Sequence, residues 1–228
     1  MRPSVQDLSL FYASPLGGYV AAEINTLLKT WAPSSVFAHA IGLGYASPYK
    51  EVLCALSQKT LLIMPASQGA EPGTCLAREE MLPLADDSCD AMLLVHCLEF
   101  ALDSSEVLKE SWRVLTPGGS LFIFVPNIYG LWAHFSVTPF GMGKAFSEAD
   151  LRTIFEDVGF RPGHSTFLLS VPWLPAESFL RKHLSTKVLM PEKVLPGVLA
   201  MQGVKTLYRP VLLHDVEDPR ECPAVSFA

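Results

Sequence analysis

The stretch AHAIGLGYASPYKEVL, residues 38–53, decides the fold class of this chain. A short apolar run leads into Gly42 and Gly44, and a helix-like segment follows, with Ser47 as its expected cap and Pro48 in its first turn. Gly42 allows a tight turn at the strand end, and Gly44 lets backbone N–H groups approach a ligand. The positive end of the helix points to the same place. The stretch predicts a cofactor loop, although alone it fits a tight turn without a ligand equally well.

Strands and helices alternate along the chain around this loop. Expected helices are 17–31, 47–58, 104–115 and 147–160, with a helical insert at 176–189, and expected strands are 35–44, 59–67, 91–95, 120–127, 164–171 and 203–213. This order is typical of a parallel α/β sheet. The strands are continuously apolar, as in 91–95, which favours a sheet covered on both faces.

Composition narrows the class of protein further. The chain has 228 residues and a net charge of −6, and only 18% of its residues are charged, against about 25% in average soluble domains. The acidic balance and the lack of a basic stripe argue against nucleic acid as the partner. The low charge content favours apolar surface held against a protein partner, a second copy or a bulky ligand.

Targeting signals and cysteines point to the cytoplasm. The apolar runs are shorter than the roughly 20 residues that span a membrane, and the N-terminus lacks the pattern of a signal peptide. The five cysteines have no C-x-x-C spacing, which indicates buried, reduced thiols. We therefore expect a cytoplasmic protein without a membrane span.

Three motifs in order carry a family resemblance. LPLADDSCDAMLLVHCLEF (82–100), ESWRVLTPGGSLFIFVPN (110–127) and FSEADLRTIFEDVGF (146–160) resemble the fourth strand, the helix-to-fifth-strand crossing and the next helix of class I S-adenosylmethionine-dependent methyltransferases, in particular the type 11 group. The resemblance implies an α/β, Rossmann-like class I methyltransferase fold with a mostly parallel seven-stranded sheet and helices on both faces. It also implies S-adenosyl-L-methionine as cofactor.

We expect a single methyltransferase-like domain over 1–228. Its expected parts are an N-terminal helical cap (1–35), a cofactor-binding core (36–127), a substrate lid loop (128–146), C-terminal helices and strands (147–213) and a tail (214–228).

The resemblance assigns residues to the cofactor. Those implied to line it are Gly42, Leu43, Gly44, Met64, Pro65, Glu80, Met81 and His96. For Glu80, an equally good interpretation is that it belongs to a solvated acidic loop without a ligand. Two customary acids are missing, because Ala40 and Met64 stand where the family has carboxylates, although Glu71 could reach back from its loop.

His96 is the candidate catalytic residue, because an imidazole can accept a proton from a nucleophile near neutral pH. A structural histidine bonded to backbone is an equal alternative. Glu99 follows three residues later, but no further ligands lie nearby in the sequence, so we expect no metal site.

Aromatic residues after the fifth strand and near the N-terminus are candidates for the substrate site, because ligands of open α/β sheets bind outside the carboxyl ends of the strands. The candidates are Tyr12, Tyr129, Trp132 and Phe140. Simple packing of these rings within their loops is the competing interpretation.

The expected function is S-adenosylmethionine-dependent methyl transfer to a small or medium-sized, partly apolar acceptor. The alternative is a catalytically inactive methyltransferase-like protein that acts as a binding or assembly module, which the missing acids favour. A nicotinamide-dependent oxidoreductase is poorly supported, because Ser47 replaces the third glycine of its fingerprint.

Overall fold

The computed structural model describes residues 2–32, 37–134, 138–169 and 196–207. The predicted helical insert, the predicted tail and the last part of the predicted strand 203–213 lie outside these residues.

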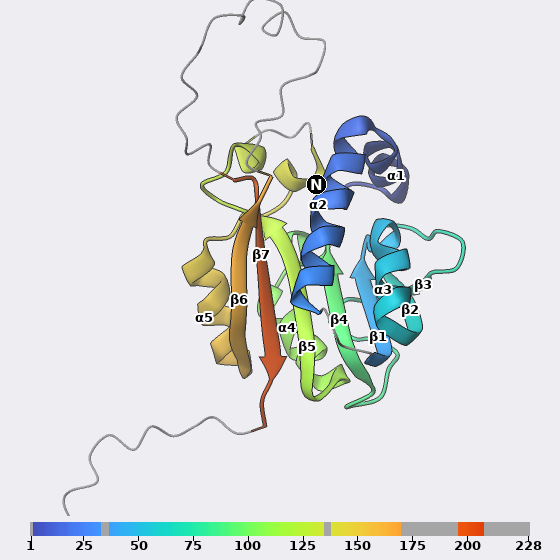
Figure 1. The fold of residues 1–228 in the computed structure, drawn as a ribbon, viewed down its shortest axis with the longest axis vertical. Coiled ribbons are helices and arrows are strands. Elements are labelled where there is room, and N and C mark those ends of the chain that lie inside the picture. Colours follow the sequence, from blue (N-terminus) through green and yellow to red (C-terminus); the bar gives the residue numbers. More distant parts are fainter. Residues whose placement is uncertain (1, 33–36, 135–137, 170–195, 208–228) are drawn as a thin grey trace, which may run out of the picture.

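One seven-stranded sheet forms the centre of the molecule, in the order β3-β2-β1-β4-β5-β7-β6 (Figure 1). The five strands from β3 to β5 pair in parallel, and β7 is antiparallel to both β5 and β6. The bounds are β1 (Phe37–Gly44), β2 (Ser57–Pro65), β3 (Cys75–Ala77), β4 (Cys89–Val95), β5 (Leu115–Pro126), β6 (Phe160–Leu168) and β7 (Val198–Lys205). This architecture confirms the predicted fold class.

Helices cover both faces of the sheet. They are α1 (Val5–Ala13), α2 (Pro15–Trp31), α3 (Lys50–Leu56), α4 (Ser104–Val114) and α5 (Glu148–Val158). The helices α2 and α3 lie in front of the sheet in Figure 1, and α4 and α5 lie behind it. The continuously apolar strands supply side chains to both layers, which gives one buried cluster on each side.

The helix α1 lies across the end of the sheet at which the parallel strands terminate (Figure 1). It begins at a capping box, in which the Ser4 side chain accepts from the Asp7 N–H while the Asp7 carboxylate accepts from the Ser4 N–H. Ser14 ends α1 and also caps α2, where its hydroxyl accepts from the Gly17 N–H. The two helices are therefore joined at a single extended residue.

The structure corrects three details of the sequence interpretation. The N-terminal residues before 15 form a helix of their own, α1, and the short edge strand β3 was not expected. Ser47 does not cap the helix that follows it: a 3-10 turn over Ser47–Tyr49 starts after Ala46 without a side-chain cap, and the Ser47 hydroxyl donates to Glu71 instead.

Candidate cofactor and active site

The two glycines of the loop are required by the packing of the protein itself. Gly44 has φ +88°, and a Cβ there would lie 2.1 Å from the carbonyl oxygen of Val95 on β4. At Gly42 a Cβ would lie 2.5 Å from Cβ of Ala46 and 2.7 Å from Cδ2 of Leu62. The loop therefore follows the sheet closely, and no larger residue fits at either position.

A carboxylate does reach this loop, although none lies at the end of β2. Glu71 accepts hydrogen bonds from the hydroxyls of Tyr45, at 2.8 Å, and Ser47. Tyr45 follows Gly44 directly, and its N–H donates to the Val95 carbonyl. Glu71 thus holds the turn between β1 and α3 from a position several residues beyond the expected acid.

His96 stands at the end of β4 at the centre of a buried hydrogen-bonded chain. Its Nδ1 lies 3.2 Å from a Glu99 oxygen, and its Nε2 lies 2.9 Å from the hydroxyl of Tyr12, which lies 2.8 Å from that of Tyr49. When the imidazole is neutral and Glu99 is ionised, Nδ1–H donates to the carboxylate, Nε2 accepts from the Tyr12 hydroxyl, and Tyr12 in turn accepts from Tyr49. Glu99 therefore fixes the tautomer that turns a basic nitrogen toward α1.

Two features of the hydrogen-bonded chain around His96 are energetically unfavourable. His96 has φ +53°, a left-handed conformation that costs about 1–3 kcal/mol in a non-glycine residue. The second oxygen of Glu99 is buried and has no hydrogen-bond partner among the described residues. Strain and an unpaired buried carboxylate oxygen beside a histidine are typical of a site that receives a ligand.

Burial keeps the tyrosines of the site neutral. It raises the pKa of Tyr12 well above its ordinary value, and the neighbouring Tyr49 adds to the shift. Burial likewise raises the pKa of Tyr45 and of Tyr49. These phenols therefore act as hydrogen-bond donors and acceptors in this site.

The side chains of α1 fill the space above the loop. Leu8 is fully buried in one apolar cluster with Tyr45 and Met64, and Val5 and Tyr12 pack against it. The Tyr12 ring stacks on the Tyr45 ring, with centroids 5.5 Å apart. Residues predicted to line a cofactor are therefore covered by the protein's own N-terminal helix.

The predicted substrate residues divide into two groups. The rings of Phe140 and His96 lie 4.6 Å apart, Tyr12 contacts the same histidine, and Trp132 packs edge-on against Phe140, so three of the four lie together. Tyr129 lies apart, 65% exposed.

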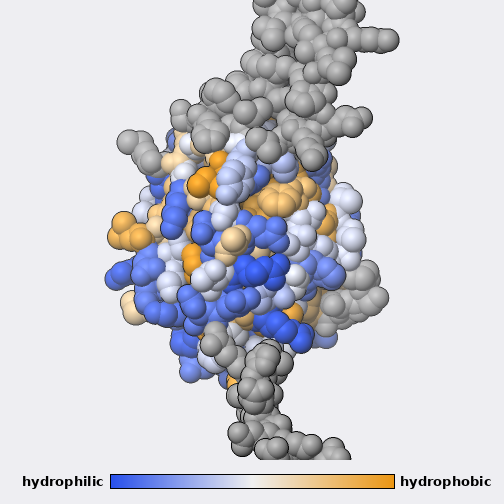
Figure 2. Space-filling model, turned by 90° about the vertical axis from the view of Figure 1, so that its left-hand side faces the viewer, coloured by the Kyte–Doolittle hydropathy of each residue, from blue (hydrophilic) through white to orange (hydrophobic). Residues whose placement is uncertain are grey.

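Tyr129 lines a separate groove of about 440 Å³ with Phe167 and the start of α5. Hydrophobic residues on this side of the molecule gather in its upper half (Figure 2). The polar side chains that α5 and its cap contribute to the groove are engaged: Ser147 caps α5, and Glu148 pairs with Arg152 and accepts from Ser165. This groove offers little that would orient a ligand.

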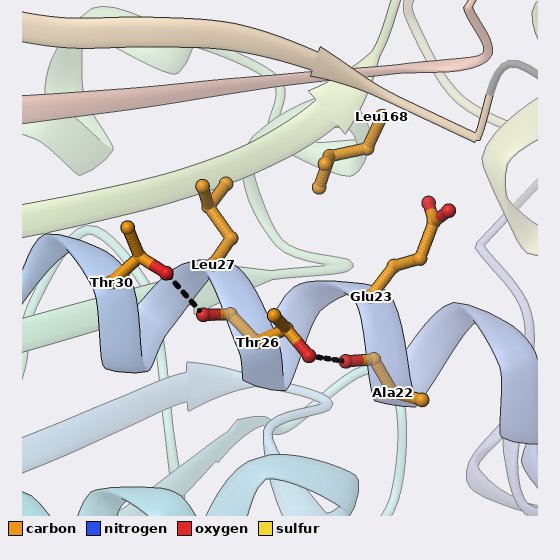
Figure 3. Close-up of a pocket in the computed structure, with 6 residues that line it drawn as sticks. All are labelled: Ala22, Glu23, Thr26, Leu27, Thr30 and Leu168. Carbon is orange, nitrogen blue, oxygen red and sulfur yellow. Dashed lines mark hydrogen bonds between the residues drawn. The ribbon is translucent and has the colours of Figure 1, made fainter.

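A second groove, of about 370 Å³, lies between α2 and the end of β6 (Figure 3). Its hydroxyls are used within the helix, because Thr26 donates to the Ala22 carbonyl and Thr30 to the Thr26 carbonyl. Glu23 accepts from Tyr19 and from the Leu169 N–H. The groove therefore resembles ordinary helix packing more than a binding site.

Glu80 and Met81 lie beside β3, on the loop that resembles the adenine edge of the family. Glu80 is half-buried and lies 3.7 Å from the exposed Arg78 side chain, and Met81 is 66% exposed. Both are accessible to a ligand at this edge, unlike the residues under α1.

The polar groups of the site fit the cofactor that the family implies, while side chains of α1 cover the same residues. Glu71 and the unpaired oxygen of Glu99 are suited to hydroxyl and amino groups. Leu8 and Tyr12 occupy the volume above Met64 and the glycine loop. With α1 docked, Met64 is 1% exposed and His96 is 0% exposed.

The sequence interpretation missed Arg2, Leu8, Tyr45 and Tyr49 as members of this site. The repeated aromatics of YASPY, residues 45–49, were a usable signal, because they flank the helix start next to the glycines. Leu8 and Arg2 carried no local signal, since only the tertiary fold brings α1 over the loop.

Among the described residues, no group of three or more His, Cys, Asp or Glu side chains is arranged to hold a metal ion. Within the same residues, no helix has the length and hydropathy needed to cross a membrane.

Comparison with known proteins gives a match to one protein-family model. Residues 44–123 match the model of the type 11 methyltransferase family, described as a methyltransferase domain. No curated protein sequence matches the chain closely enough to count as a relative.

Solved structures share the fold at low sequence identity. One is a chain of the Haloferax volcanii complex between the Trm112 methyltransferase activator and a methyltransferase, with 19% identity, a TM-score of 0.60 and coverage of 88% of this chain and 98% of that one. Another is a Thermotoga maritima SAM-dependent methyltransferase described as a "possible histamine N-methyltransferase", with 18% identity, a TM-score of 0.62 and coverage of 89% and 96%.

The same fold also occurs in the [4+2]-cyclase SpnF, with 14% identity, a TM-score of 0.55 and coverage of 82% of each chain. Its name shows that the fold does not fix the reaction. At these identities the structures establish the architecture alone, whereas the sequence match begins at Gly44, the second glycine of the loop, and includes β2, β3, β4 and most of β5. The chain therefore has a class I methyltransferase fold, and its residues 44–123 match the type 11 methyltransferase domain model.

Proposed function

We propose that this protein binds S-adenosyl-L-methionine and transfers its methyl group to a small or medium-sized, partly apolar acceptor in the cytoplasm. The observation that carries the proposal is His96, whose Nε2 points from the end of β4 toward the space above the glycine loop while Glu99 holds Nδ1. The family match over residues 44–123 supports the cofactor.

In this proposal the chain supplies binding, orientation and a proton acceptor. Glu71 and the loop from Gly42 to Gly44 hold the cofactor, with Met64, Pro65, Glu80 and Met81 along its nucleoside. When bound, the cofactor supplies a methyl group already activated on a positively charged sulfur. His96 Nε2 accepts the proton of the acceptor, and Phe140 and Trp132 exclude water from that side.

A second function follows from the covered loop. A protein whose own helix fills its cofactor site, and which lacks acids at Ala40 and Met64, also fits a non-catalytic binding module. The complex of the Haloferax volcanii neighbour with an activator makes a protein partner a reasonable candidate for this alternative.

Calorimetric titration with S-adenosylmethionine and S-adenosylhomocysteine distinguishes the two. Micromolar binding, followed by methyl transfer to at least one acceptor of a panel of aromatic alcohols and amines, is expected. The variant His96→Ala should lower kcat by about 10²–10⁴-fold at saturating cofactor if His96 is a general base. Cofactor binding without transfer to any acceptor of the panel would contradict the proposed methyl transfer but not the cofactor site. No binding of either compound to the folded protein would contradict the cofactor site and favour the binding module.

A further inference from the structure

The N-terminal helix is held over the loop at both of its ends. At its start, the Arg2 guanidinium forms an ion pair with the buried Glu79 carboxylate, donates to the Ser67 hydroxyl at 2.7 Å and reaches the Cys97 carbonyl at 3.5 Å. These partners lie on the segments that follow β2, β3 and β4. One side chain just before α1 therefore contacts the segments that follow three strands, β2, β3 and β4.

At the other end of α1, the Tyr12 hydroxyl bonds to His96 and Tyr49. Between the two ends, Leu8 is fully buried against Tyr45 and Met64. The helix thus combines a partly buried ion pair, an apolar anchor and a buried hydroxyl, and all three contact residues at the carboxyl end of the sheet.

These contacts and the proposed cofactor use the same residues. Met64, Tyr45 and His96 surround the place where the family holds its cofactor, and each is in contact with α1. A ligand and a side chain cannot occupy one volume, so docking of α1 and binding of the cofactor exclude each other.

The construction of α1 suits a movement as one body. Its capping box closes the first turn within the helix itself, and the extended Ser14 separates it from α2. A rotation at this residue would leave both helices intact, and the change would break the contacts of Arg2, Leu8 and Tyr12 together.

We propose that α1 is an intrinsic plug: in its docked position it occupies the cofactor site, and cofactor binding requires its release. This inference rests on the proposed cofactor function and adds its regulation. The apparent dissociation constant rises in inverse proportion to the fraction of molecules with an open site, so a plug docked in about 95% of molecules weakens apparent affinity about 20-fold.

Two leucines of α1 provide a matched test. Leu8 is fully buried in the plug contact, whereas Leu10 is 73% exposed on the same helix. Leu8→Ser should release α1, and S-adenosylhomocysteine should then bind at least about ten-fold more tightly than to the wild type. Leu10→Ser, which makes the same chemical change, should bind like the wild type.

Hydrogen exchange of the full chain gives a readout that is independent of activity. Amides of 5–13 should exchange slowly in the wild type and in Leu10→Ser, and faster in Leu8→Ser and on addition of S-adenosylhomocysteine. Arg2→Ala, which removes the other anchor, serves as a second variant and should also bind more tightly, should Leu8→Ser fail to fold.

The outcomes separate this inference from the function on which it rests. Weaker or unchanged binding by folded Leu8→Ser and Arg2→Ala, or slower exchange of 5–13 with ligand, would show that α1 does not act as a plug and would leave cofactor binding intact. A released α1 with no binding at millimolar ligand would contradict the cofactor function and the plug together.

Discussion

Gly44 and Gly118 share a left-handed backbone but have different surroundings. Their φ angles are +88° and +81°, yet a Cβ at Gly44 would lie 2.1 Å from the Val95 carbonyl, whereas nothing lies within 4 Å of one at Gly118. Left-handed geometry alone costs an alanine about 1–2 kcal/mol, and a clash in a packed region adds about 1–3 kcal/mol. Gly44→Ala should therefore lower the free energy of unfolding by at least about 2 kcal/mol, and Gly118→Ala by about 1 kcal/mol. Denaturant titration measures both, and equal losses would show that the loop relaxes around a side chain.

Glu110 is the residue whose ionisation should matter most for stability in acid. It accepts from the Leu82 N–H at 2.6 Å and from two nitrogens of Arg113, at 2.8 and 2.6 Å. The hydrogen bonds from Arg113 lower the pKa of the Glu110 carboxyl, although burial opposes the shift. Because the folded pKa lies below the unfolded value of about 4.3, this stabilisation is complete above that pH and is lost as pH falls through the folded pKa.

Glu110→Gln should thus lower the free energy of unfolding by about 1–2 kcal/mol at pH 7, and the difference should shrink below about pH 4. Glu106→Gln on the same helix is the control, since its ion pair with Lys109 is exposed to solvent and should change the free energy of unfolding much less. Denaturant titration of the wild type and both variants at several pH values from about 3 to about 7, on both sides of the ordinary carboxyl pKa of about 4.3, measures how each difference in free energy of unfolding changes with pH. If Glu110→Gln lowered the free energy of unfolding by the same amount at every pH, the packing of the side chain, and not its charge, would account for the stabilisation.

At the scale of elements, α1 controls the ionisation of the tyrosine cluster. Burial raises the pKa of Tyr12, Tyr45 and Tyr49, so these phenols should stay neutral well above pH 10, the ordinary value of about 10 for tyrosine. Because the pKa values of these tyrosines are higher in the folded protein than the unfolded value of about 10, their contribution to the stability of the docked helix is complete below about pH 10. The contribution falls as pH rises above that value. Leu8→Ser should therefore let some of these phenols titrate near pH 10, about the value for exposed tyrosine, as followed by tyrosinate absorbance. Leu10→Ser should titrate like the wild type, and identical curves for all three proteins would mean that α1 does not cover the cluster.

Some of the helices and strands could be predicted from the sequence, and others could not. The strands at 59–67 and 91–95 were predicted almost in place, because a continuous apolar run between breakers leaves few alternatives. The helix α1 was missed, because it is short, is followed by SPLGG, and owes its position to contacts with distant strands. His96 and the glycines were predicted because they stand in local sequence motifs. The hydrogen bond from Tyr12 to His96 and the ion pair of Arg2 with Glu79 were not predicted, because they join residues far apart in the chain.

At the scale of the whole molecule, the last described strand, β7, packs against both layers of helices. β7 lies between β5 and β6 and contributes Leu199 and Met201 to one core and Val198 and Ala200 to the other. Strain in this strand should therefore reduce the stability of the entire domain and not of one layer.

Gly203 on β7 and Gly163 on β6 test that coupling. A Cβ at Gly203 would lie 2.5 Å from Cε1 of the fully buried Phe155 on α5, whereas at Gly163 the nearest atom, the carbonyl oxygen of Gln202, would be 3.4 Å away. Gly203→Ala should lower the free energy of unfolding by about 1–3 kcal/mol because the ring must move, and Gly163→Ala should change it by no more than about 0.5 kcal/mol. If the sheet couples both layers, circular dichroism and tryptophan fluorescence should give one coincident transition with an unchanged m-value. Two separate transitions in Gly203→Ala would show instead that the α5 layer unfolds independently of the layer that carries the candidate site.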